Sequence, residues 1–157
     1  MKKEISFILN GEKRSLDVNS GDILLHVIRD GLGVKSPKCG CERGDCGTCT
    51  VMINGKTVKS CLVLAIEVDG LEVTTLEGLM KGDLTPLQKT FLDNNSFQCG
   101  FCAPGMVVAA TELVNKNKKP TKDEIKEALA GNLCRCTGYS PIIDAVHECA
   151  HKGANHE

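Results

Sequence analysis

The chain has 157 residues, a formal net charge of −1 and 41% hydrophobic residues, which bound its size and class. This length allows one ordinary domain or two small ones. A near-neutral chain without an extended basic face argues against a nucleic-acid-binding protein, whose affinity would come from neutralising phosphates. No apolar run is long enough for a signal peptide or for the roughly 18 residues of a membrane span, so we expect a cytoplasmic protein without membrane insertion.

The first half of the sequence predicts short strands joined by tight turns. Three turn dipeptides separate runs of extended character: Asn10-Gly11, Asn54-Gly55 and Asp69-Gly70. Such dipeptides suit type I′ hairpins, because both central residues need a positive φ. Leu24, Leu25 and Ile28 recur at helical spacing within residues 21–33, which predicts one helix. We therefore expect a small mixed sheet with one helix across it.

The second half predicts helices instead of hairpins. Four helix-start signals are found there: Thr85-Pro86, Pro104, Thr121 with Glu124, and Ser140-Pro141. The pattern changes near residues 77–84. We therefore expect an α+β chain with a β-rich domain over 1–77 and an all-α four-helix domain over 78–157. Domains this small bury little apolar surface, so bound metal would add needed stability.

Ten cysteines are the unusual feature of the composition. In a cytoplasmic protein thiols stay reduced, which disfavours a disulfide framework. Cys41, Cys46 and Cys49 form C-x4-C-x2-C and Cys61 follows, the spacing of plant-type [2Fe–2S] ferredoxins. A loop with this spacing directs three thiolates to one side of a cluster, and the fourth arrives from a neighbouring element.

The residues around these four cysteines fit the same interpretation. Gly40, Gly44 and Gly47 would allow bends with positive φ and leave backbone N–H groups free to hydrogen-bond to anionic sulfurs. Cys39 competes with Cys41 for the first position, but it would give C-x6-C, a poorer match. We therefore interpret Cys39 as a spare thiol.

Four further cysteines lie in the helical half: Cys99, Cys102, Cys134 and Cys136. Predicted helices begin just after each pair, and helix N-termini favour an anionic centre. Four cysteines also suit structural zinc, so spacing alone leaves zinc and an iron–sulfur cluster both open for this set. Cys149 lies at the apolar spacing of the last helix, where we expect it to be a buried small side chain.

Three segments together carry a specific resemblance: CGCERGDCGTC, QCGFCAPGM and GNLCRCTGYSPI. The chain closely resembles, over nearly its whole length, the iron–sulfur subunit of the molybdenum hydroxylases, the xanthine dehydrogenase and aldehyde oxidoreductase family. The resemblance implies a ferredoxin-like β-grasp domain followed by a four-helix domain, each with one [2Fe–2S] cluster. It thereby favours a cluster over zinc in the second set.

The resemblance also implies roles for individual residues. The cluster nearer solvent and the flavin would be held by Cys41, Cys46, Cys49 and Cys61. The cluster facing the molybdenum cofactor would be held by Cys99, Cys102, Cys134 and Cys136. Gln98 and Cys136 would also approach the pterin.

In such an enzyme a separate large subunit binds molybdopterin and oxidises the substrate, which in this family is a purine, nicotinate, an aldehyde, carbon monoxide or hydroxybenzoyl-CoA. This chain would relay electrons to a FAD-binding medium subunit or another acceptor. We find no motif for a catalytic base, a nucleophile or a dinucleotide site, so we expect no catalytic residue. The alternatives are a free-standing two-cluster ferredoxin-like carrier, which the QCG block with Gln98 disfavours, and a zinc-binding module.

Overall fold

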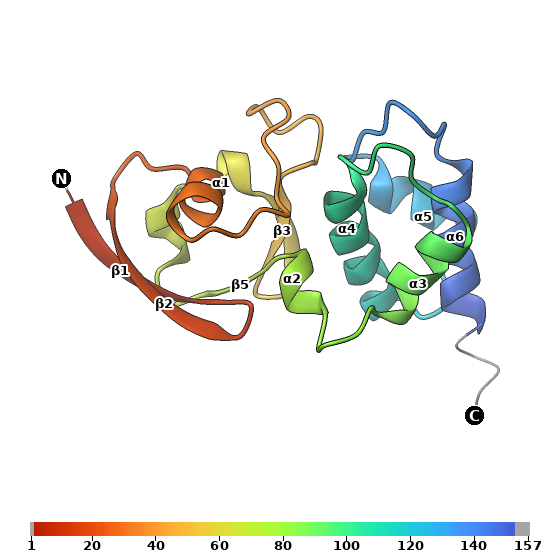
Figure 1. The fold of residues 1–157 in the computed structure, drawn as a ribbon, viewed down its shortest axis with the longest axis horizontal. Coiled ribbons are helices and arrows are strands. Elements are labelled where there is room, and N and C mark those ends of the chain that lie inside the picture. The colour runs from red at the N-terminus through yellow and green to blue at the C-terminus, as the bar shows by residue number, and fades with distance from the viewer. Residues whose placement is uncertain (1, 153–157) are drawn as a thin grey trace.

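The computed structural model describes residues 2–152, which form a sheet-containing half and a helical half lying side by side (Figure 1). The sheet has five strands in the order β2-β1-β5-β3-β4. These strands are β1 (Lys2–Leu9), β2 (Glu12–Asn19), β3 (Thr50–Ile53), β4 (Lys56–Lys59) and β5 (Glu72–Thr74). Only β1 and β5 pair in parallel, and all other neighbours are antiparallel. The predicted mixed sheet is thus confirmed.

Two of the three predicted hairpins are present. Asn10 and Gly11 join β1 to β2 with φ values of 54° and 84°. Asn54 and Gly55 join β3 to β4 with φ values of 48° and 77°. Both turns therefore place two successive residues in the left-handed region, as a type I′ turn requires.

The third hairpin, at Asp69-Gly70, was predicted wrongly. The residues before it form a 3₁₀ turn, Ala65–Val68, and not a strand. The Glu67 carboxylate accepts the N–H of Leu64 over 2.8 Å, which closes this turn. Ala65 and Val68 are both fully buried, so the apolar residues repeat at a spacing of three and not of two. The chain then enters β5, which lies between β1 and β3.

One helical segment crosses the sheet, as predicted. It starts as α1 (Leu24–His26) and continues as a π-helical turn over Val27–Gly31. Leu24 and Ile28 are fully buried in the core of this half, which they share with Phe7 on β1. The helix therefore supplies the apolar layer that covers one face of the sheet.

The helical half contains α2 (Leu76–Leu79), α3 (Pro86–Asp93), α4 (Ala103–Lys116), α5 (Lys122–Leu129) and α6 (Ser140–Lys152). The four predicted helices are confirmed, and α2 is an additional short one. The hydroxyls of Thr85 and Thr121 cap α3 and α5 by accepting N–H groups of the first turn. Within residues 2–152, no helix combines the length and the apolar character that crossing a bilayer would require.

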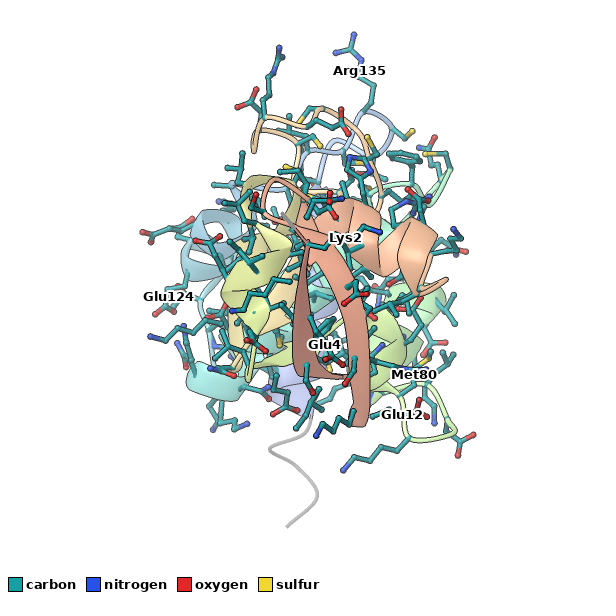
Figure 2. The ribbon with its side chains drawn as sticks, turned by 90° about the vertical axis from the view of Figure 1, so that its left-hand side faces the viewer. Lys2, Glu4, Glu12, Met80, Glu124 and Arg135 are labelled. Carbon is teal, nitrogen blue, oxygen red and sulfur yellow. The ribbon has the colours of Figure 1, made fainter. Side chains whose placement is uncertain are left out.

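The two halves contact each other through α4, which packs against β3 and β4. Thr57 on β4 donates its backbone N–H to the Glu112 carboxylate on α4 over 2.9 Å. The loops that carry the two cysteine sets lie at the same edge of the molecule, the top of Figure 1. Figure 2 shows this edge from the sheet end, with Arg135 extending outward from it. The fold thus brings both sets to one side.

Candidate metal centres

The first cysteine set is assembled from one long loop and one short turn. Cys41 and Cys46 lie in residues 34–49, which have neither helix nor strand, and Cys49 directly precedes β3. Cys61 lies in the 3₁₀ turn Ser60–Leu62 after β4. The Ser60 hydroxyl donates to the carbonyl of Cys49 over 2.7 Å, which holds these last two segments together. The thiols meet in two pairs: Cys41 with Cys46, and Cys49 with Cys61.

The glycines of this loop have two different roles. Gly44 and Gly47 have φ values of 86° and 73°, as predicted. The prediction for Gly40 was wrong, because its φ is not positive, and Glu42 makes a bend there with a φ of 55°. Gly40 is needed for space instead: a Cβ at this position would lie 2.9 Å from the Cys46 Sγ.

The two thiol pairs of the first set differ in their electrostatics. The backbone N–H groups of Arg43 and Cys46 lower the pKa of Cys41 to about 7, because they donate to its sulfur. Burial raises the pKa of Cys61 to about 11. The outer sulfur is therefore the more readily ionised of the two, and a bound metal would supply the positive charge that favours ionisation of the inner one.

The second set joins the start of α4 to the α5–α6 loop. Cys102 is the residue before the first turn of α4, and Cys99 lies in the loop that leads to it. Cys134 and Cys136 lie in the loop between α5 and α6. The Sγ atoms of Cys99 and Cys136 are 3.7 Å apart, and the thiol of Cys102 contacts that of Cys134.

Neighbouring polar groups hold the second set in place. The Tyr139 hydroxyl accepts the N–H of Cys134 over 2.9 Å, and the Thr137 hydroxyl donates to the Cys134 Sγ over 3.1 Å. Burial raises the pKa of Cys134, but hydrogen bonds led by that of Thr137 outweigh it, so the net pKa is lowered. Burial raises the pKa of Cys102 to about 12. Sequence reasoning missed Thr137 and Tyr139, although two hydroxyl residues within three positions after CRC were a usable signal.

Each set consists of an outer and an inner pair of thiols. The inner pairs are Cys49 with Cys61, and Cys102 with Cys134. Among residues 2–152, no three His, Cys, Asp or Glu side chains gather as they would around one metal ion. The four donors of each set meet as two pairs, and in a [2Fe–2S] centre each of the two irons takes two protein ligands. The donor chemistry and the pairing therefore fit one such centre per set.

Backbone contacts join the two sets directly. The N–H of Leu133, next to Cys134, donates to the carbonyl of Cys46 over 2.9 Å. The neighbouring Asn132 side chain is only 3% exposed and donates its amide to the carbonyl of Gly47 over 3.0 Å. The loop of the first set thus rests directly on the loop of the second.

Comparison with known proteins agrees with this arrangement. A family described as a 2Fe-2S iron-sulfur cluster binding domain matches residues 7–77, and one described as a [2Fe-2S] binding domain matches residues 75–147. The chain is 44% identical over 155 residues to the nicotinate dehydrogenase small FeS subunit of Eubacterium barkeri, covering 98% of this chain and 99% of that one. It is 46% identical over 143 residues to the nicotine 6-hydroxylase small subunit of Paenarthrobacter nicotinovorans, covering 91% and 87%.

The chain belongs to the family of small iron–sulfur subunits of the molybdenum hydroxylases. The crystal structure of quinoline 2-oxidoreductase from Pseudomonas putida 86 contains a chain of the same fold, with a TM-score of 0.93 at 40% identity over 99% of this chain and 98% of that one. The predicted α+β fold is confirmed, as are two [2Fe–2S]-binding domains and an electron-transfer role within an oxidoreductase. A free-standing carrier is not favoured, because the relatives are subunits.

The structure places Cys39 of this iron–sulfur subunit outside the thiol pairs. Cys39 is exposed, and a hydrogen bond with the Glu42 carboxylate raises its pKa, in contrast to that of Cys41. We predict that Cys39→Ser keeps the full iron content, whereas Cys41→Ser loses the two irons of the first centre. Iron analysis and the visible spectrum measure both. Equal iron loss in the two variants would show that Cys39 is a ligand.

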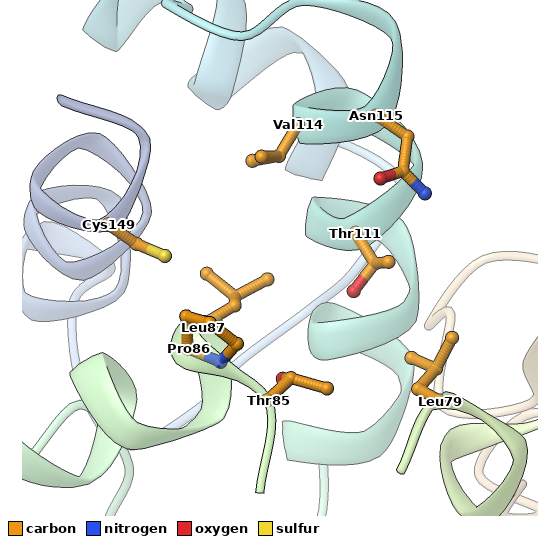
Figure 3. Close-up of a pocket in the computed structure, with 8 residues that line it drawn as sticks. All are labelled: Leu79, Thr85, Pro86, Leu87, Thr111, Val114, Asn115 and Cys149. Carbon is orange, nitrogen blue, oxygen red and sulfur yellow. The ribbon is translucent and has the colours of Figure 1, made fainter. Parts of the chain in front are cut away.

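Cys149 lies on α6, away from both sets. It is partly and not fully buried, and burial raises its pKa. It lines a cavity of about 250 Å³ together with Leu87 on α3 and Val114 on α4 (Figure 3). None of the eight paired cysteines lines this cavity, so it forms no part of the metal centres.

Proposed function

We propose that this chain relays electrons between a large molybdopterin-binding subunit and a FAD-binding medium subunit or another acceptor. Cys41, Cys46, Cys49 and Cys61 hold one cluster, and Cys99, Cys102, Cys134 and Cys136 hold the other. A bound [2Fe–2S] cluster supplies a centre that gains or loses one electron. The observation that carries the proposal is the direct backbone contact between two sets of paired thiols at one edge of the chain.

The second set faces the large subunit in this proposal. Its outer thiols, Cys99 and Cys136, are exposed, so a partner can approach them closely. Gln98 is exposed beside them, and its amide donates to the carbonyl of Cys136 over 3.1 Å. Gln98 thus fixes the backbone of Cys136 from the side where the pterin would bind. The exposed outer pair supports placing the molybdopterin there.

Three further assignments belong to the same proposal. The chain divides into one domain over 1–77 and another over 78–157, in keeping with the two separate apolar cores, and α2, which spans this boundary, packs Leu76 and Leu79 against the helical core. The partners include a medium subunit that binds FAD, in keeping with the words "small subunit" in a relative's name. The protein works in the cytoplasm, where reducing conditions keep unpaired cysteines as thiols.

Metal analysis of the purified full-length chain tests this proposal. We expect about four irons and no zinc per chain, and two distinct paramagnetic species after dithionite reduction. Cys49→Ser and Cys102→Ser should each remove one species and about half of the iron. Native purification should also recover a large molybdenum-containing chain. Bound zinc, or a single paramagnetic species in the unmodified protein, would contradict the ligand assignment.

A further inference from the structure

Lys59, the last residue of β4, reaches across the junction between the two halves. Its ammonium donates to the carbonyl of Gly131 over 2.7 Å and to the Thr50 hydroxyl over 3.2 Å. Thr50 lies opposite Lys59 in the β3–β4 pair and directly follows Cys49. Gly131 belongs to the segment that leads to the second set. One cation therefore joins the end of the first set to the approach to the second.

The charge of Lys59 has no acidic partner among residues 2–152: no carboxylate oxygen there lies within 4.0 Å of its nitrogen. The side chain is partly buried, and burial lowers the pKa of Lys59. The charges that raise its pKa are those of the four first-set thiols, Cys49, Cys46, Cys61 and Cys41. Lys59 also lies two residues before Cys61, and Thr50, to which its ammonium donates, directly follows Cys49, so the fold places this charge beside the segments that carry the inner pair of the first set.

An uncompensated cation beside a redox centre favours the state with more negative charge. Reduction adds an electron, so the attraction to Lys59 is stronger in the reduced state than in the oxidised one. The interaction is weakly screened here, because the ammonium is partly buried and its hydrogen bonds are to neutral groups.

We propose that Lys59 tunes electron transfer through its charge. The charge raises the reduction potential of the centre held by the first set relative to that of the second. This inference rests on the ligand sets proposed above. The charge therefore shifts the equilibrium of the relay toward the first-set centre, so an electron that enters at the second set resides at the first more often than it would without Lys59.

Redox titration followed by electron paramagnetic resonance tests the role of Lys59 in the iron-loaded full chain. The first-set centre is identified as the one whose paramagnetic resonance signal is missing in the Cys49→Ser variant. In Lys59→Met we expect the reduction equilibrium of that centre to fall about tenfold relative to the second, which is about 59 mV for one electron. Lys59→Arg keeps the charge and should restore most of the shift. Lys56→Met is the matched control, because Lys56 is an exposed lysine on the same strand and should leave both potentials unchanged.

Three results would overturn the inference. In the first, Lys59→Met lowers the unfolding midpoint but leaves the first-set potential unchanged, which would make Lys59 only a structural tie. In the second, Lys59→Met shifts the reduction potentials of both centres equally. In the third, Lys59→Arg shifts the potential as far as Lys59→Met does. A failure of the proposed function would show itself separately, because the unmodified chain would then lack one or both of the two paramagnetic species.

Discussion

Gly47→Ala is expected to destabilise the iron-loaded protein by about 3 kcal/mol, through left-handed backbone strain and overpacking together. A Cβ at this position would lie 2.3 Å from the carbonyl oxygen of Gly131 and 2.7 Å from the Asn132 amide nitrogen, and φ is 73°. Backbone atoms cannot move aside as a flexible side chain can. The loop of the first set must therefore separate from the loop of the second. Urea unfolding followed by circular dichroism measures the loss, and iron analysis shows whether both centres remain loaded.

Gly55→Ala is the matched control for this variant. Gly55 has nearly the same φ, 77°, but a Cβ there would meet nothing within 4 Å. Only the backbone strain is then introduced, which costs roughly 1–2 kcal/mol. If Gly47→Ala destabilises the protein no more than Gly55→Ala does, the contact between the two loops does not contribute.

Gly105→Ala tests the same contact from the side of α4, the helix that carries Gly105. Helix propensity alone predicts that alanine stabilises this position by up to about 1 kcal/mol. A Cβ there, however, would lie 2.3 Å from the carbonyl oxygen of Gly47. We therefore expect a net destabilisation in the same unfolding measurement. A more stable variant would show that α4 can shift away from the first-set loop at little cost.

Removal of iron by a chelator should abolish cooperative unfolding of the chain. Residues 34–49 have no helix or strand, so a bound metal centre would contribute much of what holds their conformation, beside the hydrogen bonds from Leu133 and Asn132. In the second set, Cys102 and Cys134 are packed with the core of the helical half, so loss of the centre also loosens that core. Metal binding in small domains supplies folding free energy of about 10 kcal/mol or more, comparable to the whole net stability of a domain.

Thermal unfolding of the apo-protein, followed by circular dichroism, checks this expectation. The broad transition expected for the apo-protein should become sharp again after reconstitution with iron and sulfide. Because each half has its own apolar core, residual helix in the apo-protein is consistent with the prediction. An apo-protein that unfolds in one sharp transition at the original temperature would contradict it.

The local elements of this fold were predictable because local chemistry determines them. Asn10-Gly11 and Asn54-Gly55 specify their turns through the positive φ that both residues tolerate. Thr85 and Thr121 specify helix starts through side-chain caps that need no distant partner. The prediction failed at Asp69-Gly70, where Glu67 closes a 3₁₀ turn whose buried residues pack into the core of the sheet-containing half.

The sequence by itself determined the order of the two halves and the grouping of eight cysteines into two sets, because ligand spacing and turn chemistry act over a few residues. Only the tertiary structure decided how the sets meet. The hydrogen bond from Leu133 to the carbonyl of Cys46 joins residues 87 positions apart in the chain, and Lys59 reaches Gly131 over a separation of 72. Such contacts depend on how α4 packs against β3 and β4, and no local pattern in the sequence encodes that packing.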